Sequence, residues 1–139
     1  MKNDQTLKNV LILDTTDTSL SIIAQAVLKR YLRAVNVKSA GINAAKAVDE
    51  NTKKILKESG LWSEEFSPKT LKDFEEEQFD LVITLSEYAM KKCPDFETDT
   101  DIIAIEYDAP DPKRLSSYKE ALKLIQMEIT PIVRMHFED

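Results

Sequence analysis

The residues best placed for chemistry lie in one short loop, residues 14–21, which joins an apolar run to a helical pattern. Asp14 opens the loop and Asp17 follows, whereas no Lys, Arg or His is present in it. In α/β proteins such a loop usually holds an anion, because the first backbone N–H groups of the following helix have no intrahelical acceptor. The sequence therefore predicts a candidate pocket whose own charge disfavours an anion, formed by Asp14, Thr15, Thr16, Asp17, Thr18 and Ser19.

Three hypotheses are open for the Asp14 carboxylate. In the first, it replaces the anion and accepts hydrogen bonds from the loop and from the helix N-terminus, where negative charge is favourable. In the second, Asp14 and Asp17, with or without Asp111, hold Mg²⁺ or Ca²⁺, although they match no known ligand spacing. In the third, Asp14 accepts a phosphoryl group, which would require a metal ion or a Lys nearby.

The loop is positioned by an alternation of apolar runs and helical patterns. Apolar runs predict strands over residues 9–13, 35–39, 79–85 and 102–107. Apolar spacing predicts helices over residues 19–33, 45–59, 68–77 and 86–92, and a last helix from about residue 116. Thr18 or Ser19 is the expected cap of the first helix, and Pro131 is expected to kink or interrupt the last one. This alternation predicts a parallel sheet covered on both faces. Ligands bind beyond the carboxyl ends of such strands, where Asp14, Ser39, Ser86 and residues 108–111 fall.

Composition limits the classes of ligand and partner. The 139 residues suffice for one domain, and the net charge of −6 argues against nucleic acid and anionic membranes as partners. No apolar stretch reaches the roughly 20 residues of a membrane span, and the polar N-terminus favours a cytoplasmic protein. One cysteine and one histidine exclude an internal disulfide and a tetrahedral Cys/His zinc site. Two glycines are too few for a dinucleotide or P-loop nucleotide motif, so no cofactor is expected.

Several motifs together resemble one known family. The run Val10-Leu11-Ile12-Leu13, followed by the loop and the first helical pattern, is similar to the opening of the low-molecular-weight protein tyrosine phosphatases and the thioredoxin-coupled arsenate reductases. Further landmarks agree in order and spacing: Ser39-Ala40-Gly41, Val82-Ile83-Thr84-Leu85 with Cys93-Pro94, and Asp111-Pro112. The resemblance covers nearly the whole chain. It implies one domain over residues 1–139, a three-layer α/β/α fold with a four-stranded parallel sheet.

The resemblance breaks at the catalytic loop. The family signature is a Cys, five further residues, an Arg and a Ser: the Cys is a thiolate nucleophile, and the Arg clamps the phosphoryl or arsenyl oxygens. Here Asp14 stands at the Cys position and Leu20 at the Arg position, and only Ser21 is kept. Thr16, Asp17 and Ser19 replace the family's Gly, Asn and second Cys. Of the arsenate reductase relay cysteines, the first falls on Ser86 and the second is kept as Cys93, while Asp111 holds the position of the general acid.

These changes oppose oxyanion binding. A like-charge pair at about 4 Å costs on the order of 4 kcal/mol at a surface-like dielectric, and the missing Arg removes roughly 1.5–3 kcal/mol. A millimolar ligand has only about −4 kcal/mol of binding free energy. Thr16 is also expected to resist a positive φ that Gly accepts. The resemblance thus implies a non-catalytic relative, a binding or regulatory module with a protein partner or as a homodimer. The alternative is a metal-dependent or residual phosphatase or arsenate reductase-type enzyme that uses Asp14, Asp17 and Asp111.

Overall fold

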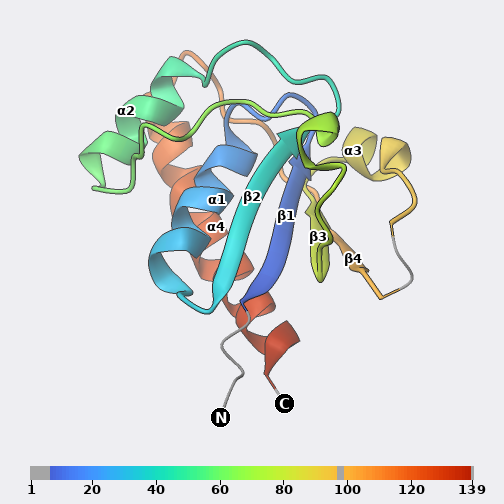
Figure 1. The fold of residues 1–139 in the computed structure, drawn as a ribbon. Coiled ribbons are helices and arrows are strands. Elements are labelled where there is room, and N and C mark those ends of the chain that lie inside the picture. The colour runs from blue at the N-terminus through green and yellow to red at the C-terminus, as the bar shows by residue number, and fades with distance from the viewer. Residues whose placement is uncertain (1–6, 97–98, 139) are drawn as a thin grey trace.

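A single parallel sheet organises the chain, of which the computed structural model describes residues 7–96 and 99–138. Within these residues, four strands pair in the order β2-β1-β3-β4, at Lys8–Asp14 for β1, Val35–Gly41 for β2, Leu81–Thr84 for β3 and Asp101–Ala104 for β4 (Figure 1). The helices are α1 at Leu20–Tyr31, α2 at Glu50–Glu58, the 3₁₀ helix η1 at Leu71–Phe74, α3 at Glu87–Lys92 and α4 at Leu115–Phe137. The predicted four-stranded parallel α/β sheet is confirmed.

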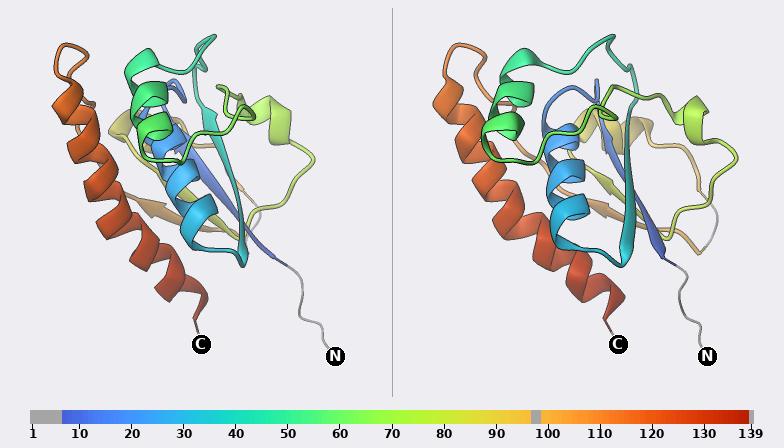
Figure 2. Two further views of the ribbon diagram at one scale, coloured as in Figure 1. Left: turned by 90° about the vertical axis from the view of Figure 1, so that its left-hand side faces the viewer. Right: turned by 60° about the vertical axis from the view of Figure 1, so that its left-hand side comes forward.

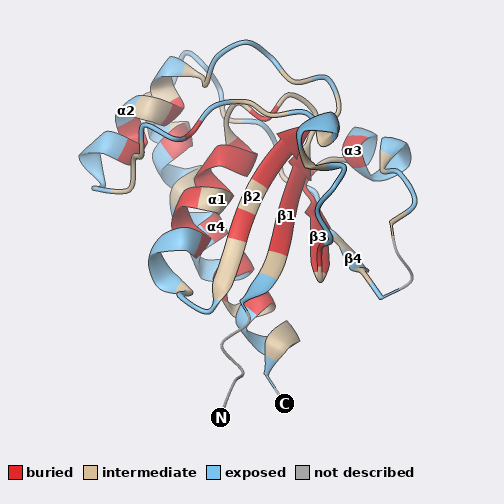
Figure 3. Cartoon of the chain, viewed as in Figure 1, coloured by how far each residue is buried: buried red, intermediate tan, exposed pale blue. Residues whose placement is uncertain are grey.

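Both faces of the sheet are covered. Figure 2 shows α1, α2 and α4 stacked on one side of the sheet, with η1 on the other. On the first side, Val10 and Ile12 of β1 join the large core cluster with α1 and α4; on the second, Leu11 and Leu13 pack with Ala89 of α3. All four of these β1 side chains are fully buried, as the red central strand of Figure 3 illustrates. A strand buried on both faces needs a continuous apolar run rather than an alternating one.

The start of α1 differs from the predicted capping. Ser19 is the N-cap, but its side chain makes no capping hydrogen bond. Its Oγ instead accepts a hydrogen bond from the Thr52 hydroxyl at 2.8 Å, and the Thr18 hydroxyl pairs with that of Thr16 at 2.8 Å. Because both hydroxyls are engaged elsewhere, the first N–H groups of α1 are left without a side-chain acceptor.

Two predicted helical stretches are not helical, and each has the same cause. The helix expected over residues 45–59 begins only at Glu50, where Asp49 caps it by accepting from the Asn51 N–H at 3.0 Å. The helix expected over residues 68–77 is reduced to the single turn η1. In both cases the backbone preceding the helix bonds to the loop of residues 14–21 or to the edge of β2, so those N–H and C=O groups are not available to a helix.

The last helix is continuous. The interruption predicted at Pro131 does not occur, since α4 runs from Leu115 to Phe137 with Pro131 inside it. Buried residues on both sides of the proline, Ile125, Ile129 and Val133, lie in the large core cluster with α1 residues. This packing stabilises the helix across the missing N–H of the proline. In the part of the chain that the structure describes, no helix is both long and apolar enough to cross a membrane.

Candidate functional site

The loop of residues 14–21 turns its carbonyl groups toward the chain that follows β2. The carbonyls of Asp14, Thr15 and Thr16 accept hydrogen bonds from the N–H groups of residues 42, 43 and 45 at 2.8–3.0 Å, and that of Thr18 accepts from Asp49 at 3.0 Å. Within residues 7–96 and 99–138, the N–H groups of residues 16–22 have no protein acceptor. A loop with bonded carbonyls and unpaired N–H groups at a helix N-terminus is the arrangement that binds anions in proteins.

Asp17 holds this loop from inside. It is fully buried, and its backbone has a φ of 57°. Its Oδ1 accepts from the Ser21 hydroxyl at 2.7 Å and its Oδ2 from the Lys69 N–H at 2.9 Å. Burial raises the pKa of this carboxyl; the hydrogen bonds from Ser21, Lys69 and Ser39 offset part of that effect, and the nearby Asp14 charge adds to it.

The backbone strain predicted at Thr16 does not arise. The positive φ in this loop falls on Asp17, a residue type that enters the left-handed region more easily than a β-branched one. Thr16 itself therefore does not have to adopt a positive φ.

Gly41, at the end of β2, lets the loop pack closely. A Cβ at this position would lie 2.7 Å from the carbonyl carbon of Thr16 and 3.0 Å from the Asp17 nitrogen. Real Cβ atoms essentially never show the first contact, and the second is tighter than nine in ten real Cβ contacts. Backbone atoms cannot turn aside as a side chain can, so only glycine fits here without moving the loop.

Asp14, which the sequence resemblance places at the nucleophile position, accepts a hydrogen bond from the adjacent Thr15 N–H at 2.8 Å. Burial raises its pKa, and hydrogen bonds from Thr15 and the Ser86 side chain lower it in part. Ser86 also pairs with the Thr15 hydroxyl at 3.1 Å and caps α3 by accepting from Ala89 at 3.0 Å. If Asp14 took the place of an anion, its carboxylate would accept hydrogen bonds from the loop and from the N-terminus of α1. In the described residues it accepts a backbone hydrogen bond from Thr15 but none from α1.

Leu20, which the sequence resemblance places at the position of the clamping Arg, is the first residue of α1. It is 5% exposed and lies in the large core cluster. It also lines a surface depression of about 380 Å³ with Tyr107, residues 108–111 and Arg114. Three carboxylates line the same depression, those of Asp108, Asp111 and Glu120, against the one guanidinium of Arg114.

Asp111 lines this depression, but its hydrogen bonds stabilise the turn before α4. Its Oδ1 accepts from the Lys113 N–H at 3.0 Å, and its own N–H donates to the Ser117 hydroxyl at 2.8 Å. In the described ranges, no group of three or more His, Cys, Asp or Glu side chains is arranged to hold a metal ion. The hypothesis of a site from Asp14, Asp17 and Asp111 gains no support from this arrangement, because both oxygens of Asp17 already accept protein hydrogen bonds.

The helix α3 separates Ser86 and Cys93, the two residues that the resemblance aligns with the relay cysteines. Ser86 begins this helix beside the loop, whereas Cys93 follows its last residue and packs among the residues of the second core cluster. The Cys93 thiol is half-buried, and burial together with the Asp95 charge raises its pKa. A raised pKa lowers the thiolate fraction and with it the reactivity of the sulfur.

Sequence reasoning missed the residues that support the loop from outside it. Thr52 and the Lys69 backbone contact Ser19 and Asp17 across 33 and 52 positions of sequence. No local pattern marks such long-range contacts. Gly41 carried a usable signal, since it closes a strand in a chain with only two glycines.

Comparison with known proteins identifies the family of the chain. The family model described as low molecular weight phosphotyrosine protein phosphatase matches residues 9–135. The chain belongs to this family. No curated protein sequence matches the chain.

Solved structures of the phosphatase family and its arsenate reductase relatives share the fold. An arsenate reductase from Archaeoglobus fulgidus is 27% identical, with a TM-score of 0.76 over 89% of this chain and 98% of that one. A thioredoxin-dependent arsenate reductase from Corynebacterium glutamicum is 25% identical, with a TM-score of 0.78 over 96% of this chain and 63% of that one. The low molecular weight protein tyrosine phosphatase of T. tengcongensis, 19% identical with a TM-score of 0.76 over 92% of this chain and 99% of that one, shares the fold.

Proposed function

We propose that this member of the phosphatase family turns over neither phosphate esters nor arsenate and serves as a binding or regulatory module. One observation carries the proposal: Asp14 and Leu20, which the resemblance places at the nucleophile and clamp positions, lie in a loop whose N–H groups at residues 16–22 have no protein acceptor among the described residues. A carboxylate stands where the thiolate nucleophile is needed, and an apolar side chain stands where the clamp is needed.

The charges around the loop support this proposal. An oxyanion seated on the N–H groups of residues 16–22 would lie beside the Asp14 carboxylate. At about 4 Å this repulsion costs on the order of 4 kcal/mol, and no Arg or Lys in the loop offsets it. The carboxylates of the depression beside Leu20 repel the same ligand. Together, the repulsion from Asp14 and from the carboxylates of the depression exceeds the binding free energy of a millimolar ligand, about −4 kcal/mol.

The supporting contacts favour a retained binding role over a decayed enzyme. Asp17 accepts two hydrogen bonds, from Ser21 and Lys69, and Gly41 packs closely against Thr16. We expect the binding partner to be another protein or a second copy of this chain, in the cytoplasm. Light scattering on the purified chain separates these two possibilities, because only the second raises the mass with concentration.

Restoration of the lost groups tests the proposal. We expect the wild-type chain to hydrolyse p-nitrophenyl phosphate no faster than the buffer blank, and inorganic phosphate to leave the amide resonances of residues 16–22 unchanged. The double variant Asp14→Cys/Leu20→Arg should bind phosphate at those amides, because the loop conformation is already present. Its matched control, Asp14→Ser/Leu20→Arg, should bind phosphate without turnover, since it lacks the thiol.

Two outcomes would overturn the proposal. Wild-type turnover above the blank that Asp14→Ala abolishes would show that the carboxylate is catalytic. Millimolar Mg²⁺ or Ca²⁺ that shifts amides 13–21 and brings about turnover would establish the metal-dependent alternative instead.

A further inference from the structure

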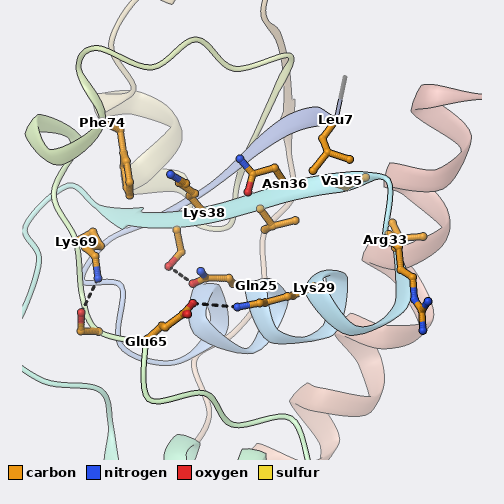
Figure 4. Close-up of a pocket in the computed structure, with 14 residues that line it drawn as sticks. Leu7, Gln25, Lys29, Arg33, Val35, Asn36, Lys38, Glu65, Lys69 and Phe74 are labelled. Atoms are coloured by element: carbon orange, nitrogen blue, oxygen red, sulfur yellow. Dashed lines mark hydrogen bonds and ion pairs between the residues drawn. The ribbon is translucent and has the colours of Figure 1, made fainter. Parts of the chain in front are cut away.

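The two edges of the sheet differ in how far the chain covers them. Along β2, Val37 is 9% and Ser39 2% exposed. The Gly41 N–H donates to the Lys69 carbonyl at 2.8 Å. Figure 4 shows Lys69 and Phe74, from the segment that leads into η1, beside this strand. The edge of β2 is therefore closed by a later segment of the chain.

The opposite edge of the sheet, at β4, is exposed. β4 is the last strand in the order β2-β1-β3-β4 and pairs with β3 alone (Figure 1). Ile102 is 48% exposed, and Ala104 and Glu106 are exposed as well. Among the described residues, no segment forms a β-bridge on the side of β4 that faces away from β3. That side is an open strand edge.

The backbone of residues 102–106 directs alternate groups to this edge. The Ile105 N–H donates to the Thr84 carbonyl of β3 at 2.9 Å. Successive residues of a strand direct their N–H and C=O groups to opposite edges, so those of Ile102, Ala104 and Glu106 point away from β3. In the part of the chain that the structure describes, these groups have no hydrogen-bond partner. Such a row of groups is a template for another strand.

The last helix, α4, lies along β4 and runs in the opposite direction. Its Glu128 accepts from the Tyr107 hydroxyl, beyond the end of β4, at 2.8 Å. The Nε2 atom of its His136 lies 3.0 Å from the carboxylate of Asp101, at the start of β4. A later residue of α4 thus contacts an earlier residue of β4, which makes the two elements antiparallel.

An apolar stripe of α4 borders the open edge. Residues separated by three, four or seven positions share a helical face, so Leu124, Pro131 and Met135 lie on the same face of α4 as Glu128. Glu128 turns this face toward β4 through its hydrogen bond with Tyr107. Leu124 is 42% and Met135 71% exposed. The open edge is therefore continued by uncovered apolar surface, which in soluble proteins marks an interaction site.

We propose that the edge of β4 pairs with β4 of a second copy of this chain, in an antiparallel two-fold dimer with Ala104 opposite Ala104. In this register Ile102 lies opposite Glu106 of the second copy, so all three outward residues of both copies exchange main-chain hydrogen bonds. Ile103 lies opposite Ile105, which brings two β-branched side chains together on the side of the sheet that α4 covers.

The charges of the edge are compatible with this pairing. The two Glu106 residues would lie four positions apart along the ladder, about 13 Å, and the two Asp101 residues six positions apart, about 20 Å. Both distances exceed the Debye length of about 8 Å at physiological salt. No acid faces an acid, because Glu106 faces Ile102 and Asp101 faces Tyr107.

The apolar stripe favours a second copy over a foreign peptide. A two-fold axis that joins two antiparallel edge strands is perpendicular to the sheet, so both copies of α4 lie on the same face of the joined sheet. Each stripe then faces the stripe of the other copy, and one surface patch is used twice. A short peptide strand would bring no second helix to cover Leu124 and Met135.

This inference narrows the proposed binding role to a second copy of the chain, but it depends on other residues. A chain that hydrolysed aryl phosphate could still form the dimer, and a chain without turnover could remain a monomer. The two proposals therefore fail independently.

The test uses the full chain. We expect sedimentation equilibrium to show reversible association of two copies as the concentration rises from micromolar to millimolar. At concentrations that favour the dimer, hydrogen exchange should slow at the amides of Ile102, Ala104 and Glu106. The Ile105 amide, which is already bonded to Thr84, is the internal control and should not change.

A proline variant removes one main-chain donor of the edge. Ala104→Pro should weaken association at least tenfold, because the Ala104 N–H points away from β3 and proline is tolerated on an open edge. Its unfolding curve confirms that the chain still folds.

A charge pair at one position tests the register. Ile102→Glu should weaken association at least tenfold relative to Ile102→Lys, because each new side chain would face Glu106 of the second copy. The control Tyr31→Glu changes a side chain that is 46% exposed at the end of α1, and it should alter association less than twofold.

Several results would overturn the proposal. One is a chain that remains monomeric at millimolar concentration, and another is a dimer that leaves the three edge amides unprotected. Equal association of the two Ile102 variants would refute the register, and a dimer of the folded Ala104→Pro variant as tight as that of the wild type would refute the edge pairing. A chain that stays monomeric but protects these amides when an extended valine–threonine peptide is added would assign the edge to a strand of another protein instead.

Discussion

Asp17 offers the sharpest test of how the loop is held, through the replacement of its carboxylate by a methyl group. Asp17→Ala would leave the buried Ser21 hydroxyl and the Lys69 N–H without the acceptor they now share. Each buried donor without an acceptor costs about 1–3 kcal/mol. Alanine at a φ of 57° adds roughly 1–2 kcal/mol of backbone strain.

Part of this cost is offset, because the buried carboxylate itself opposes folding. Burial raises the pKa of Asp17, so its charged form is less stable in the folded chain than in water. With that offset, we expect Asp17→Ala to lower the free energy of unfolding by about 3 kcal/mol, a large share of the roughly 5–15 kcal/mol typical of a domain.

The matched variant is Asp17→Asn. Asparagine keeps an acceptor for the Lys69 N–H, can donate to the Ser21 hydroxyl, enters the left-handed region readily and carries no charge. We expect its free energy of unfolding at neutral pH to lie within about 1 kcal/mol of the wild type or above it.

Urea unfolding at neutral pH measures both variants. Asp108→Ala, an exposed residue, is the control and should change the free energy of unfolding by less than about 0.5 kcal/mol. If the alanine and asparagine variants of Asp17 differ by less than about 0.5 kcal/mol, the hydrogen bonds of this carboxylate do not support the loop and the reasoning fails.

Three other perturbations are predicted. Gly41→Ala should destabilise the chain by about 1–3 kcal/mol and shift the amides of residues 15–17, because its Cβ would lie 2.7 Å from the Thr16 carbonyl carbon; unchanged amides would contradict this contact. The raised pKa of Asp14 means that the folded chain binds more protons than the unfolded chain, whose carboxyl titrates near about 3.9. The free energy of unfolding contributed by this group therefore falls as pH rises from that value through the folded pKa, and is lowest above it. Asp14→Asn should accordingly exceed the wild type in stability at pH 7, with a difference that shrinks toward pH 4 in urea titrations; a difference that grows on acidification would reverse the sign. Tyr118→Phe should cost about 1–2 kcal/mol, since the Tyr118 hydroxyl donates to Asp49 at 2.6 Å and its pKa is raised to about 12; an unchanged unfolding midpoint would show that this bond contributes nothing.

Local sequence patterns predicted correctly those elements whose apolar residues are buried in the core. The apolar run of β1 and the helical spacing of α1 both predicted elements that the structure has, at Lys8–Asp14 and Leu20–Tyr31. Those residues are buried whichever partner covers them, so their hydrophobic period is readable from sequence. The helices predicted over residues 45–59 and 68–77 are not formed at residues 45–49 and 68–70, because the backbone there bonds to residues distant in sequence.

By itself, the sequence determined the class of fold and the family. Tertiary structure alone decided that, among the described residues, the N–H groups of residues 16–22 have no protein acceptor. The positive φ of the loop lies at Asp17, not at Thr16. The backbone of Lys69 and Gly41, both distant in sequence, supports the loop. Hydrogen bonds between distant backbones carry no periodic signature, so which donors remain unpaired is known only once the strands are side by side.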